Sequence, residues 1–96
     1  MLFDWDQAKE KANIAKHGVG FEMAKTIFEG PVLTWTDDRL AYGEIRMRSI
    51  GRVDGIVVLA VIHTDRLGTT RIISARPASR TERRHYEEAL SKRTEP

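Results

Sequence analysis

Arginine side chains are concentrated in one stretch of this 96-residue chain, between His63 and His85. Formal charges in the stretch sum to +4, whereas the rest of the chain carries −2 and the whole chain +2. The planar guanidinium group matches the geometry of phosphate oxygens better than an ammonium group does. The stretch therefore predicts a phosphate-bearing partner, and nucleic acid is the most direct candidate. Its arginines are Arg66, Arg71, Arg76, Arg80, Arg83 and Arg84, and its acids are Asp65 and Glu82.

The sharpest part of this signal lies where a predicted strand ends and a predicted helix begins. Cations in the first turns of a helix oppose its dipole and repel one another, so stability alone does not favour them. A bound phosphate would explain the surplus, and the helix N-terminus adds backbone donors for an anion. The alternative is a solvated charged face, partly balanced by Glu82, Glu87 and Glu88. The set comprises Arg76, Arg80, Arg83, Arg84, His85 and Tyr86.

A second set of polar residues lies near the N-terminus. Lys9, Asn13 and Lys16 are spaced to share one face of a predicted helix. Lys16 and His17 fall in its last turn, where the helix dipole favours positive charge. The set is consistent with contacts to a phosphate chain and equally with an ordinary solvated stripe.

His63 ends a predicted buried strand and shares a face with Val61. A histidine in this position can act as an acid or base near neutral pH, or it can be a buried structural hydrogen-bonding group. Together with His17 and His85 it lacks the short spacings of a metal-ligand set, and the chain has no cysteine. We therefore expect no metal site and no cofactor.

These residue types suffice for RNA cleavage without a metal ion. RNA carries its own nucleophile, the ribose 2′-hydroxyl, so a protein has to orient it, stabilise charge on the phosphate and move protons. Arginines stabilise such charge, and His, Tyr, Glu or Lys can carry protons. A phosphate-binding module without catalysis would contain much the same residues, so both interpretations stay open.

Composition predicts the setting in which these residues act. A hydrophobic content of 41% and a charged content of 31% are typical of a soluble globular protein, and the length predicts a single domain over residues 1–96. The longest apolar run, Ile56 to Ile62, is too short to span a membrane. The N-terminal residues lack the apolar region of a signal peptide. Together with the absence of cysteine, this favours a cytoplasmic location.

The elements that must position these side chains follow from periodicity and from breaking residues. Asp6 is expected to cap the first helix and Gly18 to end it, and Ser79 with Glu82 forms a capping box for the last helix. Strands are expected over residues 2–5, 32–36, 44–51, 56–63 and 69–76, helices over 6–18, 21–28 and 79–92, and a polar loop over 37–43. The order β-α-α-β-β-β-β-α with tight turns predicts an α+β fold, in which helices pack on a small antiparallel sheet.

Two blocks of the sequence resemble the BrnT family, the toxins of bacterial type II toxin–antitoxin pairs. The first block is FDWDQAKEKANIAKHGVGFEMA and the second is HTDRLGTTRIISARPASRTERRHYEE, with a looser match between them at Arg46 and Ile50-Gly51. The resemblance spans residues 2–88. The loop DRLGTT and the strand EIRMRSIG depart from the usual family pattern, which leaves the roles of Arg46 and Arg66 open. The matching positions are Phe3, Trp5, Asp6, Lys9, Asn13, Lys16, His17, Gly18, Val19, Phe21 and Ala24 in the first block and His63, Thr64, Arg71, Ala78, Ser79, Glu82, Arg83 and Tyr86, with the IISAR run, in the second.

The resemblance implies a RelE-like ribonuclease fold and a toxin that cleaves RNA and inhibits translation. It also implies a cognate BrnA antitoxin, a ribbon-helix-helix protein, which neutralises the toxin in a complex of two toxins and two antitoxins that binds promoter DNA. On this basis we expect Arg76 and Arg83 to hold the scissile phosphate and His63 or Tyr86 to carry the proton, with Glu82 mainly a helix cap. A non-catalytic nucleic-acid-binding or co-repressor module is the alternative. The residues expected to contact flanking RNA are Lys9, Lys16, His17, Arg46 and Arg80.

Overall fold

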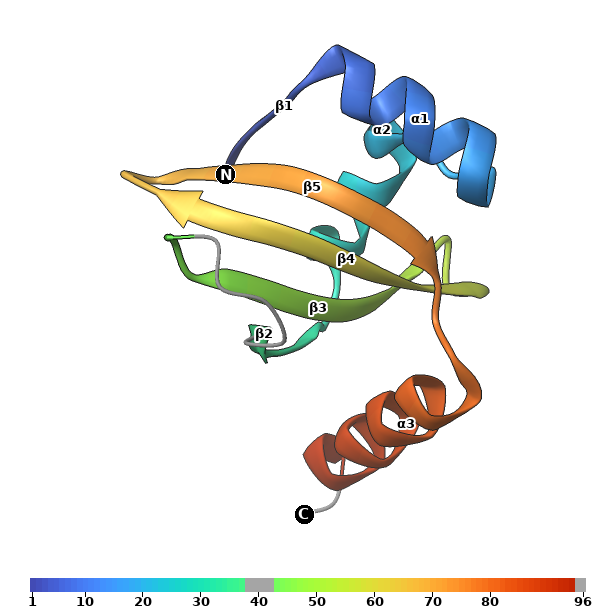
Figure 1. The fold of residues 1–96 in the computed structure, drawn as a ribbon. Coiled ribbons are helices and arrows are strands. Elements are labelled where there is room, and N and C mark those ends of the chain that lie inside the picture. Colours follow the sequence, from blue (N-terminus) through green and yellow to red (C-terminus); the bar gives the residue numbers. More distant parts are fainter. Residues whose placement is uncertain (38–42, 95–96) are drawn as a thin grey trace.

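A five-stranded sheet with helices on both faces forms the frame of the molecule (Figure 1). The computed structural model describes residues 1–37 and 43–94. The strands are β1 (Leu2–Trp5), β2 (Leu33–Asp37), β3 (Arg46–Val53), β4 (Val57–Arg66) and β5 (Thr69–Pro77), and they lie in the order β1-β5-β4-β3-β2. The helices are α1 (Gln7–His17), α2 (Phe21–Ala24), the 3-10 helix η1 (Lys25–Glu29) and α3 (Arg80–Thr94). The predicted α+β class and element order are confirmed.

Strand pairing agrees with the predicted antiparallel arrangement from β2 through β5. β1 differs, because it pairs parallel with β5 and makes the sheet mixed. Tight turns dictate antiparallel pairing only for strands that follow one another, whereas β1 meets β5 from the other end of the chain. The β3–β4 hairpin turns at Asp54 and Gly55, which both have positive φ as the sequence signal requires. The predicted polar loop 37–43 lies largely outside the described residues.

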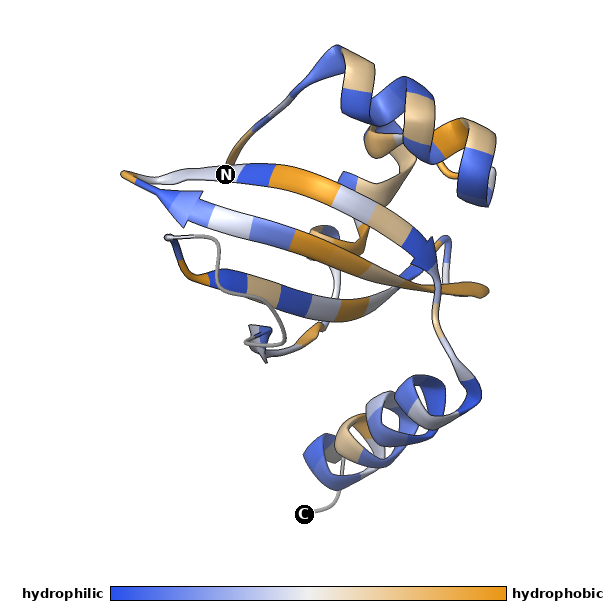
Figure 2. Cartoon of the chain, viewed as in Figure 1, coloured by the Kyte–Doolittle hydropathy of each residue, from blue (hydrophilic) through white to orange (hydrophobic). Residues whose placement is uncertain are grey.

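β4 is buried on both faces, which explains its continuous apolar run. Leu59 and Val61 face a core under α2 and η1, and the alternate residues Val58 and Ala60 face a second core under α3. Figure 2 shows the apolar stretch running along the middle of the sheet. The first core contains Val19, Phe21, Ala24, Ile27, Leu59, Val61, Ile72 and Ala75, and the second contains Ile50, Val58, Ala60 and Tyr86.

α1 is attached to the sheet by a polar residue. Asn13, the buried residue of this helix, donates through Nδ2 to the carbonyl oxygens of Ala75 (2.7 Å) and Val19 (2.8 Å). Its Oδ1 accepts from the Ala75 N–H at 3.1 Å. β1 pairs with β5 only as far as Ile72. Beyond that point, the side-chain amide of Asn13 forms hydrogen bonds with the β5 backbone that a neighbouring strand would otherwise form. This contact holds α1 beside the end of β5, where Arg76 lies.

The helix predicted over residues 21–28 is present as α2 followed by η1. Its first N–H, that of Phe21, donates to Oε2 of Glu10 from α1 at 2.8 Å. η1 then lies so close to β3 that a Cβ added at Gly51 would stand 2.8 Å from the Cβ of Ile27. The glycine therefore permits the close approach that seals the first core.

Candidate nucleic-acid interface

A buried carboxylate, Glu82, organises the junction between β5 and α3. Glu82 and Ser79 form the predicted capping box: the Ser79 N–H donates to Oε1 at 2.8 Å, and the Glu82 N–H donates to the Ser79 Oγ at 3.1 Å. Glu82 is nevertheless only 6% exposed, unlike a typical surface cap. A buried carboxylate requires compensating charge.

Two arginines from different strands provide that charge. Arg76, near the end of β5, donates through Nη1 to Oε1 (2.7 Å) and through Nη2 to Oε2 (2.9 Å) of Glu82. Arg48, from β3, donates through Nη1 to Oε2 at 3.1 Å. These contacts lower the pKa of Glu82 to about 2, chiefly through the Arg76 hydrogen bonds, with burial acting in the opposite direction. Glu82 therefore caps α3 and also holds the side chains of Arg76 and Arg48 together.

The basic hollow is a depression of about 470 Å³ beside this cluster, where α1 faces the sheet. Four of its lining residues carry permanent positive charge, and His17 adds a titratable ring. None of the described residues that line it is acidic. The lining residues are Lys9, Ala12, Asn13, Lys16, His17, Arg46, Ile62, Ile73, Ser74 and Arg76.

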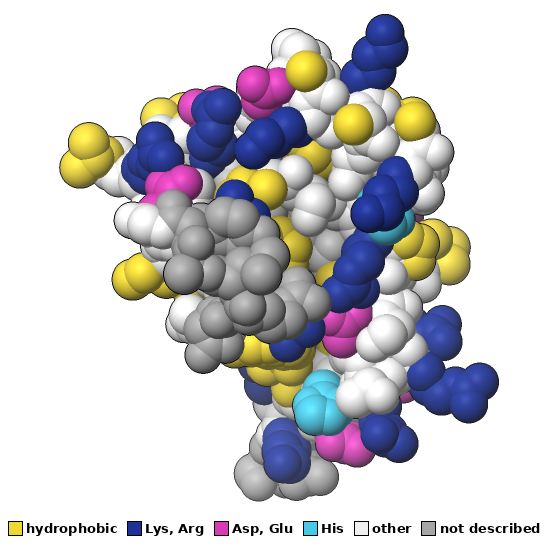
Figure 3. Space-filling model, in the orientation of Figure 1, with side chains coloured by type: hydrophobic (Ala, Val, Ile, Leu, Met, Phe, Trp, Pro, Cys, Tyr) yellow, Lys and Arg dark blue, Asp and Glu magenta, His cyan; other side chains and the backbone are white. Residues whose placement is uncertain are grey.

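The tryptophan hollow, of about 320 Å³, lies on the other side of Arg76 against the start of α3. Here the Arg48 guanidinium stacks over the ring of Trp35 at 4.3 Å from its centroid. The two hollows share Arg76 as a lining residue, and we refer to them together as the groove between α1 and α3. Figure 3 shows cationic side chains following this line from α1 toward α3. The lining residues are Trp35, Arg48, Arg76, Ser79, Thr81, Glu82 and His85.

The groove brings together many of the predicted RNA-contacting residues. Lys9, Lys16, His17 and Arg46 line the basic hollow together with Arg76, although they come from α1, β3 and β5. Arg80, the first residue of α3, is exposed and is not among the residues that line either hollow.

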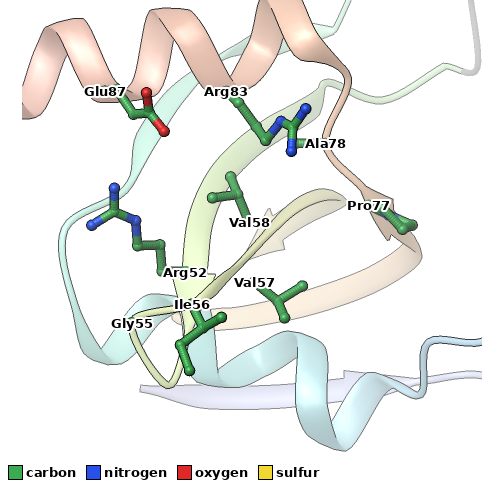
Figure 4. A pocket seen from close by; sticks show the side chains of 9 residues that line it. All are labelled: Arg52, Gly55, Ile56, Val57, Val58, Pro77, Ala78, Arg83 and Glu87. Carbon is green, nitrogen blue, oxygen red and sulfur yellow. The ribbon is translucent and has the colours of Figure 1, made fainter.

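Arg83 lies apart from Arg76, the arginine with which it is expected to hold the scissile phosphate. It lines a third hollow beside the β3–β4 turn, and Figure 4 shows its side chain among those of this hollow. Arg76 does not line this hollow, although Pro77 and Ala78, which directly follow it, do. The two arginines therefore line different hollows, and their joint contact with one phosphate stays a prediction. The hollow is lined by Arg52, Gly55, Ile56, Val57, Val58, Pro77, Ala78, Arg83 and Glu87.

His63 and Tyr86, the predicted proton carriers, are both buried. His63 is 3% exposed, with Nε2 2.8 Å from the Ser49 Oγ and Nδ1 2.9 Å from Asp65 Oδ1. Tyr86 is 2% exposed and donates its hydroxyl to the Pro31 carbonyl oxygen at 2.8 Å. Neither lines the groove. Their burial and hydrogen bonds match the structural alternative given for His63 above, and a catalytic role for either residue stays a prediction.

Arg48 and Trp35 line the groove but were missing from the predicted site. Arg48 shares a strand face with Arg46, and this spacing of two was the available signal. Trp35 carries no comparable signal, because aromatic residues in strands commonly pack in a core. Its position beside the groove becomes clear only from its pairing with Arg48 across β2 and β3. Among the described residues, no group of three or more acidic or histidine side chains could hold a metal ion.

The fold and the groove define a class of small α+β protein with a positively charged surface between two helices. The family model described as "Ribonuclease toxin, BrnT, of type II toxin-antitoxin system" matches residues 5–82, so the chain belongs to the BrnT family of ribonuclease toxins. Among solved structures it is similar to the Brucella abortus ribonuclease toxin BrnT, at 27% sequence identity and a TM-score of 0.61, covering 83% of this chain and 100% of that one. No curated protein matches the chain. In the described part, no helix is long and apolar enough to cross a membrane.

Proposed function

We propose that this toxin is a metal-independent endoribonuclease that cleaves RNA in the groove between α1 and α3. The observation that carries the proposal is the basic hollow, where Lys9, Lys16, Arg46 and Arg76 converge with no acid among the described lining residues. Such a surface attracts a polyanionic chain and releases its counterions. Family membership supplies the ribonuclease class.

The reaction we propose is attack of the ribose 2′-hydroxyl on the adjacent phosphorus, which forms a 2′,3′-cyclic phosphate and breaks the bond from phosphorus to the 5′-oxygen. The 2′-hydroxyl loses its proton to a base, and the departing 5′-oxygen takes up a proton to become a hydroxyl. The phosphate oxygens gain negative charge in the transition state, and Arg76 and Arg48 are positioned to stabilise it. Glu82 holds both guanidinium groups before RNA binds, so little reorganisation accompanies the reaction. Preorganised charge of this kind is among the largest contributions to catalysis.

The proton carrier in this proposal is His17 instead of His63 or Tyr86. His17 lines the basic hollow and is partly exposed, whereas the other two are buried in the cores. An imidazole titrates near neutral pH and can serve as acid or base toward a phosphodiester. Lys9, Lys16 and Arg46 then contact the flanking phosphates.

The partner we propose is a BrnA-type antitoxin with a ribbon-helix-helix DNA-binding domain. Neutralisation would require the antitoxin to cover the basic hollow or to displace RNA from it. The complex would contain two toxins and two antitoxins and would bind promoter DNA through the antitoxin. The family name, which specifies a type II toxin–antitoxin system, supports a protein antitoxin.

Purified toxin tests the catalytic proposal in the presence of EDTA. We expect cleavage products from RNA, and we expect a Lys9→Gln/Lys16→Gln variant to cleave about tenfold more slowly at physiological salt, because two phosphate contacts are lost. The matched control, Lys11→Gln/Lys92→Gln, removes the same charge from exposed positions outside the basic hollow and should cleave like the wild type. Salt-dependent RNA binding without products would instead identify a non-catalytic module.

A further inference from the structure

Trp35 packs against the second core and also lines the tryptophan hollow, whereas Trp5 packs against the first core. Trp5, on β1, packs in the first core with its ring edge toward Phe21 at a centroid distance of 6.0 Å. Trp35, on β2, lies opposite Arg48 in the sheet register and under its guanidinium group. The Trp35–Arg48 pair therefore places an aromatic plane and a cationic plane together beside Arg76.

The tryptophan hollow has a different chemical character from the basic hollow. Its two arginines share one carboxylate, Glu82, which leaves a formal charge of +1 in this lining against +4 in the basic hollow. Ser79, Thr81 and His85 add two hydroxyls and an imidazole at the start of α3. Such a lining suits a planar, largely neutral group with hydrogen-bonding edges better than it suits a phosphate.

We propose that the tryptophan hollow is a nucleobase subsite next to the cleaved phosphodiester. Single-stranded RNA is recognised by bases that splay out and stack on aromatic rings or guanidinium planes. Arg48 covers one face of the Trp35 ring, so the base would stack on the outer side of this pair, with Thr81 and His85 placed to contact its edge. The subsite rests on the proposed function, because Arg76 joins it to the hollow where the phosphate would bind.

With this subsite, cleavage depends on the identity of the base next to the cleaved phosphodiester. A base held against Trp35 fixes the nucleotide on one side of Arg76, while the basic hollow holds the phosphate on the other. Cleavage preference should then depend on His85 and Thr81, which take no part in charge stabilisation. These two residues are specificity determinants in this proposal.

The test uses the fluorescence of Trp35 in the full-length chain. The protein has two tryptophans, so a Trp5→Phe variant reports on Trp35 alone and keeps an aromatic ring in the first core. This variant is titrated with the four nucleoside monophosphates and, separately, with ribose 5-phosphate. We expect at least one nucleotide to quench Trp35 emission saturably and to bind about tenfold more tightly than ribose 5-phosphate, as one stacked base predicts.

A His85→Ala substitution in the same background sharpens the test. It should reduce the preference for the nucleotide over ribose 5-phosphate and broaden the base preference at mapped cleavage sites, while Glu88→Ala, also exposed on α3 but outside the hollow, should change neither. Equal affinity for ribose 5-phosphate and all four nucleotides would overturn the base subsite and leave the phosphate groove intact. Failure of every phosphate ligand to bind, together with uncleaved RNA, would overturn the proposed function as well.

Discussion

Replacing Glu82 by Gln should lower the free energy of unfolding by about 3 kcal/mol at pH 7. The carboxylate is almost completely buried and accepts hydrogen bonds from Arg76, Arg48 and the Ser79 N–H. Its pKa falls from 4.5 to about 2 on folding, and each tenfold change in proton affinity corresponds to about 1.4 kcal/mol. Removing one partner of a buried ion pair typically costs about 3–5 kcal/mol, which agrees with this figure.

The effect should depend on pH with a definite sign. Because the pKa of Glu82 is lower in the folded than in the unfolded chain, its contribution is complete above pH 4.5 and is lost as the pH falls through about 2. At pH 3 roughly half of the contribution remains. The difference between wild type and Glu82→Gln should therefore shrink from about 3 kcal/mol at pH 7 to about 1.5 kcal/mol at pH 3.

Urea denaturation at the two pH values measures this difference, and the titration of other carboxyl groups cancels between the two proteins. Glu88→Gln is the matched control, because Glu88 is exposed on the same helix. Its stability should change by less than about 0.5 kcal/mol. A Glu82→Gln penalty of equal size at pH 7 and pH 3 would refute the reasoning, since it would mean that the charge of Glu82 contributes nothing.

Two further predictions concern the frame that positions the groove. Asn13→Ala should lower the free energy of unfolding by about 3 kcal/mol in urea denaturation, because it leaves the backbone groups of Ala75 unpaired; an effect no larger than that of Lys11→Ala, at an exposed position of α1, would contradict this role. Gly51→Ala should lower the thermal midpoint by an amount equivalent to about 1–3 kcal/mol, because its Cβ would meet Ile27. Gly30→Ala, where nothing lies within 4 Å of the added Cβ, should be tolerated, and equal shifts for the two variants would count against the close-packing argument.

Local signals predicted the ends of the elements well, because neighbouring residues determine them. Asp6 caps α1 through the Lys9 N–H, and Gly18 ends it with a positive φ. The Ser79–Glu82 capping box opens α3 in the same way. The parallel pairing of β1 with β5 has no local signal, since its two strands are separated by most of the sequence.

The direction in which α3 presents its side chains explains why Arg83 and Arg76 line different hollows. Tyr86 and Leu90, one turn apart, pack against the second core and fix the rotation of the helix. Glu82 lies one turn before Tyr86 on the buried side, whereas Arg83 is rotated by about 100° and reaches the third hollow. Tyr86 and Leu90 are four residues apart in the sequence, and this spacing indicates which side of the helix is buried. Knowing that side would have placed the Arg83 side chain away from that of Arg76.

The burial of His63 could not be judged from its own strand. Its predicted strand face is correct, since it lies with Met47 and Ser49 on the side covered by η1. Phe28 from η1 places its ring edge-on to the imidazole at 5.2 Å. Whether a histidine at a strand end reaches solvent or a core depends on such a covering element, which lies 35 residues away in the sequence.

Glu82 links the stability of the fold to the charge of the groove. Its Oε1 accepts from both the Ser79 N–H and Arg76, so the atom that caps α3 also orients an arginine of the groove. Arg48 and Arg76 can therefore form their contacts with Glu82 only when α3 is packed against the sheet. Removing either arginine leaves a buried carboxylate with less compensation, so loss of activity in such a variant mixes a loss of catalytic charge with a loss of structure. For this reason the lysines of the basic hollow, which are exposed, separate function from folding better than the arginines do.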